Sequence, residues 1–293
     1  MRYAQFVIGP AGSGKSTYCT TMQRHAADSG RIIEIVNLDP AAEVFEYQPF
    51  VDIRDLIHLD DAMEDEELHY GPNGGLIFCL EFLLENSEWL REALNPDMEH
   101  DTDDDYLIFD MPGQIEMFTH LDIGRKIIKL LEDWDFRVCS VFLVDSQFMT
   151  DGAKFISGTL TALSVMANLE IPHVNILSKM DLLSKSARSQ LEKYLEPDPD
   201  ALLNEIVDES AWGRKHKRLS SAIGSLVQDY SLVRFTPLNI DDEENISDIL
   251  LTIDNVIQYG EDADVKIRED FDPPEDNDDG ENFMHDPEDY ANL

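Results

Sequence analysis

The chain has 293 residues and a formal net charge of −39, with 61 acidic against 22 basic side chains. This charge repels phosphate groups, which argues against broad binding to nucleic acid or to anionic membranes. The three cysteines lie far apart, so we predict neither a disulfide framework nor a cysteine metal site. No signal peptide and no apolar run of roughly 18 residues are seen, so we expect a soluble cytoplasmic or nuclear protein.

The first predicted strand leads directly into a glycine-rich loop with the sequence Gly9-Pro10-Ala11-Gly12-Ser13-Gly14-Lys15-Ser16. Its spacing is that of a phosphate-binding loop, and a helix is predicted next, over Lys15–Ser29. In such loops, backbone N–H groups and the helix N-terminus bind phosphate oxygens, the lysine reaches the β- and γ-phosphates, and the serine ligates magnesium. A glycine-rich turn that matches by chance is the alternative. We predict that a nucleoside triphosphate binds through Gly12, Ser13, Gly14, Lys15, Ser16 and Thr17.

Six short apolar runs alternate with helix-like stretches along the chain. This alternation predicts an α/β fold with a mostly parallel sheet and helices on both faces, as in P-loop NTPases. One domain is predicted over residues 1–260, with helical insertions at about 51–95 and 185–230. The predicted strands are Ala4–Ile8, Ile32–Leu38, Tyr106–Phe109, Val138–Val144, Val174–Leu177 and Leu232–Phe235.

Asp39 follows the second predicted strand and precedes Pro40. Ligands of parallel sheets bind at the carboxyl ends of the strands. Near a γ-phosphate this carboxylate is therefore a candidate general base or water ligand, and taken alone it is also a candidate helix cap.

An acidic amphipathic segment, Val51–His69, comes before the predicted helix Leu76–Leu94. Apolar residues cover more of this helix than the single stripe that faces a core. A buried helix and a helix that contacts a second chain both explain this pattern.

The sequence Asp110-Met111-Pro112-Gly113-Gln114 follows the third predicted strand. An aspartate at that place holds magnesium through water, the glycine N–H binds the γ-phosphate, and the glutamine orients the attacking water. Pro-Gly is also common in ordinary turns. The position next to the first strand favours the nucleotide site.

The sequence Ser178-Lys179-Met180-Asp181 closes the fifth predicted strand. In the N/T-K-x-D pattern the aspartate accepts the N1–H and N2–H groups of guanine, and the lysine stem covers the ring. Ser178 stands where Asn or Thr is usual, which weakens the expected contact to the phosphate loop. A charged helix start capped by Ser178 is the alternative. The last guanine-contacting loop, near Pro237, is not assigned.

Two charged segments have predicted roles outside the site. Residues 261–293 hold 14 acidic against 2 basic side chains, which predicts a disordered tail that serves solubility or docks onto a basic partner. The basic cluster Arg214-Lys215-His216-Lys217-Arg218 indicates a solvated helix face or a nuclear signal.

Together these motifs resemble the GPN-loop GTPases, a group of P-loop GTPases named for an inserted Gly-Pro-Asn. The insertion is present as Gly71-Pro72-Asn73. The resemblance extends from the first strand to about Gly260, and it is strongest to the third eukaryotic paralogue. The other matching segments are Gly9–Thr17, Asn37–Ala41, Asp110–Glu116, Val141–Phe148 and Val174–Leu183.

The resemblance implies a role for each of several residues. Gly71, Pro72 and Asn73 would reach across a dimer interface, with Asn73 at the partner's phosphates. Asp39 would activate the water and Gln114 would position it. Glu116 would orient these catalytic side chains without contacting the nucleotide itself. Asp110 would serve Mg²⁺ with Ser16, while Gly113, Ser178, Lys179 and Asp181 would contact GTP or GDP. No arginine finger is seen in the loop, so we expect slow turnover that depends on dimer closure.

The resemblance also implies partners. It implies a role in the assembly and nuclear import of RNA polymerase II, as a heterodimer with the first paralogue or as a homodimer. Cytoplasmic localisation with shuttling to the nucleus follows from the same expectation. Two alternatives remain open: a non-catalytic GTP-bound assembly chaperone and a P-loop nucleotide kinase.

Overall fold

The computed structural model describes residues 2–64, 70–95, 105–195 and 233–261. It divides the chain into two compact units, Met1–Tyr259 and Gly260–Leu293. The predicted acidic tail beyond residue 261, the basic cluster at residues 214–218 and most of the insertion predicted at 185–230 lie outside the described residues.

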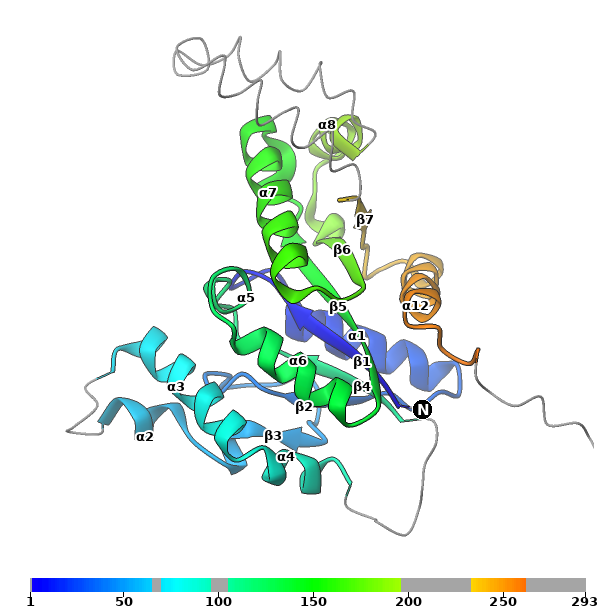
Figure 1. Ribbon diagram of the computed structural model, residues 1–293. Helices are drawn as coiled ribbons and strands as arrows, with labels where there is room; N and C mark the ends of the chain where they lie inside the picture. The colour runs from blue at the N-terminus through cyan, green and yellow to red at the C-terminus, as the bar shows by residue number, and fades with distance from the viewer. Residues whose placement is uncertain (1, 65–69, 96–104, 196–232, 262–293) are drawn as a thin grey trace, which may run out of the picture. The chain divides into compact units, whose positions relative to one another are not determined.

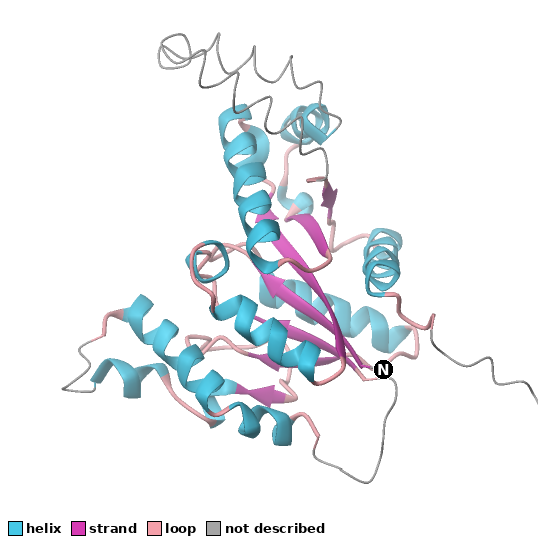
Figure 2. Ribbon diagram, viewed as in Figure 1, coloured by secondary structure: helices cyan, strands magenta, loops and turns pink. Residues whose placement is uncertain are grey.

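One sheet of seven parallel strands forms the centre of the first unit, in the order β3-β2-β4-β1-β5-β6-β7 (Figures 1 and 2). The predicted α/β class and parallel sheet are confirmed. Because β1 lies between β4 and β5, the loop that leaves β1 is flanked by the ends of both neighbours. The strands are β1 (Arg2–Ile8), β2 (Glu34–Asn37), β3 (Val51–Asp52), β4 (Tyr106–Asp110), β5 (Phe136–Asp145), β6 (His173–Ser178) and β7 (Phe235–Pro237).

Helices connect the strands and cover both faces of the sheet (Figure 1). Three short 3₁₀ segments are η1 (Ile53–Asp55), η2 (Phe148–Thr150) and η3 (Met180–Leu182). The described α-helices are α1 (Lys15–Asp28), α2 (Leu59–Glu64), α3 (Pro72–Glu85), α4 (Ser87–Ala93), α5 (Glu116–Thr119), α6 (Ile123–Asp133), α7 (Gly152–Leu169), α8 (Lys185–Leu195) and α12 (Glu243–Ile257). None of them is both long and apolar enough to cross a bilayer.

Two apolar clusters hold the helices to the sheet. Helices α1 and α12 pack on one face with Val7 of β1, and α3, α6 and α7 pack on the other face with Phe6 of the same strand. Successive strand residues point to opposite faces, so a strand covered on both sides needs apolar residues at nearly every position. Strand β5 meets that requirement, because all but its second and last residues are buried.

The structure corrects several element boundaries. The strand predicted at Leu232–Phe235 is instead Phe235–Pro237, with Leu232 outside the described residues; a proline is tolerated here because β7 is an edge strand. The strand predicted at Ile32–Leu38 is reduced to β2, since Ile32 is 81% exposed. Strand β3 was not predicted, because its two residues lie inside an acidic segment and gain strand structure only by pairing with β2.

The predicted helix Leu76–Leu94 is two helices. Helix α3 begins four residues earlier, where Pro72 occupies the first turn and Gly71 the N-cap position. Proline is favoured there because the first helical N–H groups have no partner within the helix. The break falls at Asn86, whose side-chain amide donates to the carbonyl oxygen of Phe82 at 2.8 Å. The Gly-Pro-Asn insertion therefore forms the N-terminus of α3.

Candidate active site

The phosphate loop has the predicted place between β1 and α1. Gly14 adopts the left-handed conformation, with φ of 89°, and it is the N-cap of α1. A side chain is strained at such an angle, so glycine lets the loop enter the helix with its N–H groups turned inward. The hydroxyl of Ser13 is buried and has no hydrogen-bond partner within the described ranges. A phosphate oxygen would satisfy it.

Lys15 is the first residue of α1 and is 8% exposed. Its Nζ donates to the carbonyl oxygens of Gly9 and Pro10, at 3.3 and 3.4 Å. Burial lowers the pKa of Lys15, while the charges of Asp110 and Asp39 act in the opposite direction. The carboxylates that end β4 and follow β2 therefore both act on the ammonium group, as expected for strand ends that meet at one edge of a sheet.

Asp110 ends β4 and is 2% exposed. The hydroxyl of Tyr47 donates to its Oδ2 at 2.9 Å, and the hydroxyl of Ser16 is near enough to lower the pKa of the carboxylate. Burial raises the pKa of Asp110, and the hydroxyl groups of Ser16 and Tyr47 oppose that rise. The structure thus brings together Ser16 and Asp110, the pair predicted to hold magnesium.

The donors at this place suit magnesium in particular. Within the described ranges no group of three His, Cys, Asp or Glu side chains is arranged to hold a metal ion. Magnesium is commonly bound through one or two protein oxygens together with substrate phosphates and water. One hydroxyl and one carboxylate beside a phosphate loop fit that pattern.

Gly113 lies where two loops touch. A Cβ atom on Gly113 would lie 2.8 Å from the Cα of Ala11 and 3.1 Å from its backbone nitrogen. No real Cβ atom approaches that closely, so only glycine allows the loop after β4 to lie against the phosphate loop. This contact places Gly113 against the phosphate loop, and the role of its N–H at the γ-phosphate stays a prediction.

Gln114 and Asn73 are joined within one chain. The side-chain Nε2 of Gln114 donates to Oδ1 of Asn73 at 3.1 Å, across 41 positions of sequence. The resemblance places Asn73 in the site of a partner chain, and the structure shows that it also reaches the glutamine of its own chain.

Glu116 is exposed at the start of α5, and its side chain makes no hydrogen bond or ion pair to the described residues. Its orienting role stays a prediction.

Asp39 lies in a turn after β2. Its Oδ1 accepts a hydrogen bond from the N–H of Ala41 at 2.9 Å. No helix follows, so the helix-cap alternative is wrong. Burial raises the pKa of Asp39, and the N–H of Ala41 and the charges of Lys15 and Arg54 oppose that rise. A carboxylate with a raised pKa beside a phosphate loop is suited to accept a proton.

Ser178 connects the base-reading motif to the phosphate loop. It ends β6, is 4% exposed, and its Oγ donates to the carbonyl oxygen of Ser13 at 2.6 Å. The contact that the sequence led us to expect to be weak is therefore made at short distance. Lys179, not Ser178, is the N-cap residue of η3, so the capping alternative is wrong.

Asp181 offers a buried acceptor to a ligand. Its Oδ1 is buried and has no hydrogen-bond partner in the described part of the chain. A buried acceptor without a partner costs stability, so such an atom is expected to be paired when a ligand binds. The Nζ of Lys179 lies 2.8 Å from Oδ2 of Asp145, which holds the lysine stem beside the same edge of the sheet.

A cavity of about 210 Å³ opens beside the predicted binding residue Thr17. Ile240 and Asp241, from the loop after β7, line its other side. That loop follows Pro237, where the last guanine-contacting residues were expected but not assigned.

Sequence reasoning missed Tyr47 and Arg54. Both come from the stretch between Asp39 and α2, where no motif marks them. The sequence Asp52-Ile53-Arg54 places opposite charges two residues apart, which was the one signal available.

Comparison with known proteins gives concordant matches. A protein-family model described as "Conserved hypothetical ATP binding protein" matches residues 7–259. A Danio rerio protein named GPN-loop GTPase 3 is 51% identical over 290 residues, which cover 98% of this chain and 99% of that protein. A Schizosaccharomyces pombe protein of the same name is 47% identical over 270 residues, covering 91% and 95%. The solved structure of a GTPase in apo form from Pyrococcus abyssi matches with a TM-score of 0.69 and 25% identity, over 88% of this chain and 97% of that one.

Proposed function

This chain belongs to the GPN-loop GTPase 3 family and is a GTPase, and from that premise we propose how its residues hydrolyse GTP. The resemblance read from the motifs is thereby confirmed, as is GTP hydrolysis over the alternatives of a non-catalytic chaperone and a nucleotide kinase. The observation that carries the mechanism is that the charges of Asp39 and Asp110 both act on the buried ammonium group of Lys15 in the phosphate loop.

In the proposed mechanism Asp39 accepts a proton from the attacking water, and the side-chain amide of Gln114 holds that water in line with the γ-phosphate. Lys15 and the N–H of Gly113 stabilise charge that develops on the γ-phosphate oxygens. Ser16 and Asp110 would hold Mg²⁺, which would neutralise charge on the β- and γ-phosphates when bound.

We further propose that Asp181 selects guanine. Its buried Oδ1, which has no partner among the described residues, suits together with the second carboxylate oxygen the paired N1–H and N2–H donors of that base. Adenine lacks this donor pair. The hydrogen bond from Ser178 to the phosphate loop supports the same site, because it fixes the distance between the base-reading motif and the phosphates.

Gln114→Leu should lower the turnover of GTP by roughly 10- to 100-fold, because a misplaced reactant typically costs that much. The leucine keeps the bulk of the side chain but cannot bind water, so GTP affinity should stay near that of the wild type. Single-turnover phosphate release measures the rate, and equilibrium binding of a fluorescent GTP analogue measures affinity. Gln190→Leu on α8, an exposed position, is the matched control. Equal loss of rate and affinity would contradict the water-positioning role.

We propose that the site is regulated through a dimer with the first paralogue, or with a second copy of the chain. Two observations support a contact surface at α3. Gly71, Pro72 and Asn73 are exposed, and Tyr70, Phe78 and Phe82 form a partly exposed row with ring centroids 5.5 and 6.3 Å apart. Aromatic side chains at a surface are typical of protein interfaces.

Family membership alone supports the cellular part of the proposal. It suggests that the dimer acts in the assembly and nuclear import of RNA polymerase II, and that the chain is cytoplasmic and shuttles to the nucleus.

Asn73→Ala should reduce recovery of the partner chain roughly tenfold, the cost of losing a buried polar contact at an interface. The tagged chain would be co-expressed with the first paralogue, and captured proteins would be quantified by mass spectrometry. Asn95→Ala, which removes an amide that follows α4 and donates to the carbonyl oxygen of Arg91, is the control. Unchanged recovery of the paralogue with Asn73→Ala would contradict a role of this residue at the interface, and recovery of the chain alone would favour a homodimer.

A further inference from the structure

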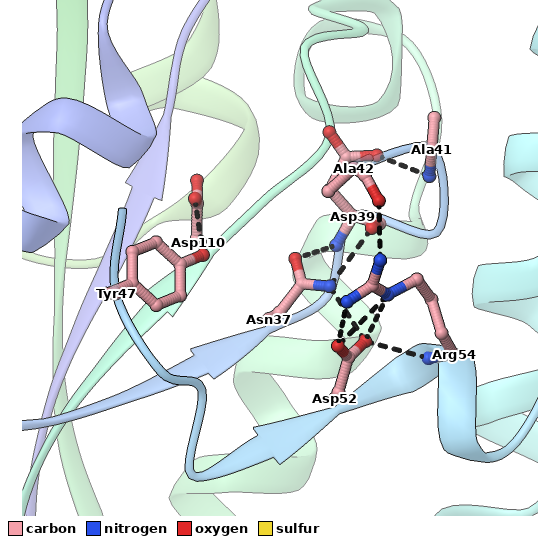
Figure 3. A network of polar contacts seen from close by, with 8 residues as sticks. All are labelled: Asn37, Asp39, Ala41, Ala42, Tyr47, Asp52, Arg54 and Asp110. Carbon is pink, nitrogen blue, oxygen red and sulfur yellow. Dashed lines mark hydrogen bonds and ion pairs between the residues drawn. The ribbon is translucent and has the colours of Figure 1, made fainter. Parts of the chain in front are cut away.

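Arg54 lies at the centre of a polar network between β2 and β3 (Figure 3). Its Nε lies 3.0 Å from both carboxylate oxygens of Asp52, and its Nη2 lies 2.5 Å from Oδ2. Its Nη1 donates to the carbonyl oxygen of Ala42 at 2.8 Å. One guanidinium group therefore joins β3 to the turn that follows Asp39.

Asn37 holds the other side of the same turn (Figure 3). It is fully buried at the end of β2, and its Oδ1 accepts the backbone N–H of Asp39 at 3.0 Å. Its Nδ2 donates to Oδ1 of Asp52 at 2.9 Å and lies 3.2 Å from the carbonyl oxygen of Asp39. The carboxylate of Asp52 thus binds Asn37 and Arg54 together.

The network reaches as far as β4. The guanidinium carbon of Arg54 lies 4.6 Å from the ring centroid of Phe45, a distance typical of cation–π contacts. That ring is 4.9 Å from the ring of Tyr47, whose hydroxyl binds Asp110. The segment between β2 and β3 is therefore folded around Arg54. It is linked to Asp39 through Ala42, and to Asp110 through Tyr47.

We propose that Arg54 is a positioning residue for GTP hydrolysis, which fixes the direction of the Asp39 carboxylate through Asp52, Asn37 and Ala42. This inference rests on the proposed role of Asp39. Arg54 itself does not touch the reacting atoms. It restrains the backbone on the far side of Asp39 while Asn37 restrains the near side, and a general base must point within a narrow range to accept a proton.

The arginine is required for its shape as well as its charge. Asp52 receives two N–H groups of the planar fork while a third nitrogen reaches Ala42, a geometry that lysine cannot reproduce. Lys15 from α1 and Asp110 from β4 are the other charged groups that act on Asp39. Neither of them contacts Ala42, so the restraint on the turn depends on Arg54.

Three variants test the inference in the full chain: Arg54→Ala, Arg54→Lys and Asp52→Asn. Each should lower the single-turnover rate roughly 10- to 100-fold, as expected when a catalytic group is displaced by about 1 Å. The dissociation constant for a fluorescent GTP analogue should stay within about threefold of the wild type, because neither Arg54 nor Asp52 is placed at the nucleotide. Hydrogen exchange at residues 38–45 should be faster, with exchange in β1 and β5 unchanged.

The matched control is Arg91→Ala, which removes an exposed arginine paired with Glu88 on α4. If Arg54→Ala does not fold, as judged by thermal unfolding, the inference is tested with Arg54→Lys and Asp52→Asn alone. A wild-type rate in Arg54→Lys, or a change in nucleotide affinity that accounts for the whole loss of rate, overturns the positioning role. Asp39→Asn is measured in parallel: if it too has a wild-type rate, the proposed function of Asp39 fails, whereas a slow Asp39→Asn with fast Arg54 variants overturns this inference alone.

Discussion

Asp39→Asn lowers the single-turnover rate of GTP hydrolysis by a factor of roughly 10²–10⁴, the range that general base catalysis contributes. The amide has almost the same shape, and its oxygen still accepts the N–H of Ala41, so the turn after β2 is kept. It cannot take a proton from water. Phosphate release from bound GTP measures the rate, and GTP affinity is expected to change by less than about threefold.

The pH profile provides the control for this result. Burial raises the pKa of Asp39, with Lys15 and Arg54 opposing that rise. A protonated Asp39 cannot act as the base, so the wild-type kcat/KM should fall as the pH decreases through this raised pKa, at a higher pH than for an ordinary aspartate. Asp39→Asn should lack that acid limb. A wild-type rate, or a limb that persists in the variant, would assign the base to another group.

Asp181→Asn should weaken GTP binding about 100-fold or more, because two hydrogen bonds to a charged acceptor are lost or mispaired. The buried Oδ1 of Asp181 has no protein partner in the described ranges, so the ligand is expected to supply it. Asparagine accepts one N–H and donates one, which suits xanthine, with its carbonyl in place of the guanine amino group. Affinity for XTP should therefore rise as affinity for GTP falls.

Binding of GTP, XTP and ATP to both proteins, by competition with a fluorescent nucleotide, measures this exchange. Asp248→Asn on α12, an exposed aspartate, removes the same charge away from the site and should change none of the three affinities. GTP binding that survives unchanged in Asp181→Asn would refute the assignment of guanine.

The sequence was sufficient to locate the residues that lie at strand ends. Asp39, Asp110 and Ser178 each follow an apolar run, and the rule that parallel strands end at one edge of the sheet brings them to the phosphate loop. Local patterns were enough here, because each residue's place depends on its own strand and on one topological rule.

Contacts between side chains far apart in the sequence could not be predicted. The hydrogen bond from Tyr47 to Asp110 spans 63 positions and depends on how the chain folds between β2 and β3. Strand β3 is only two residues long, so neither an alternation of apolar and polar residues nor its composition identifies it as a strand. The bond from Gln114 to Asn73 likewise requires α3 to begin at Pro72, whereas the apolar pattern placed the helix start at Leu76.

The hydrogen bond between Gln114 and Asn73 holds the two side chains that the nucleotide and the proposed partner would each need, Gln114 for the nucleotide and Asn73 for the partner. If Gln114 turns to hold a water at the γ-phosphate, it releases Asn73, which then becomes available to a second chain. Thermodynamic linkage makes the effect mutual: whatever GTP adds to the affinity for the partner, the partner adds to the affinity for GTP. The hydrogen bond between the amides of Gln114 and Asn73 would thus couple the presence of the γ-phosphate to the affinity for a partner chain.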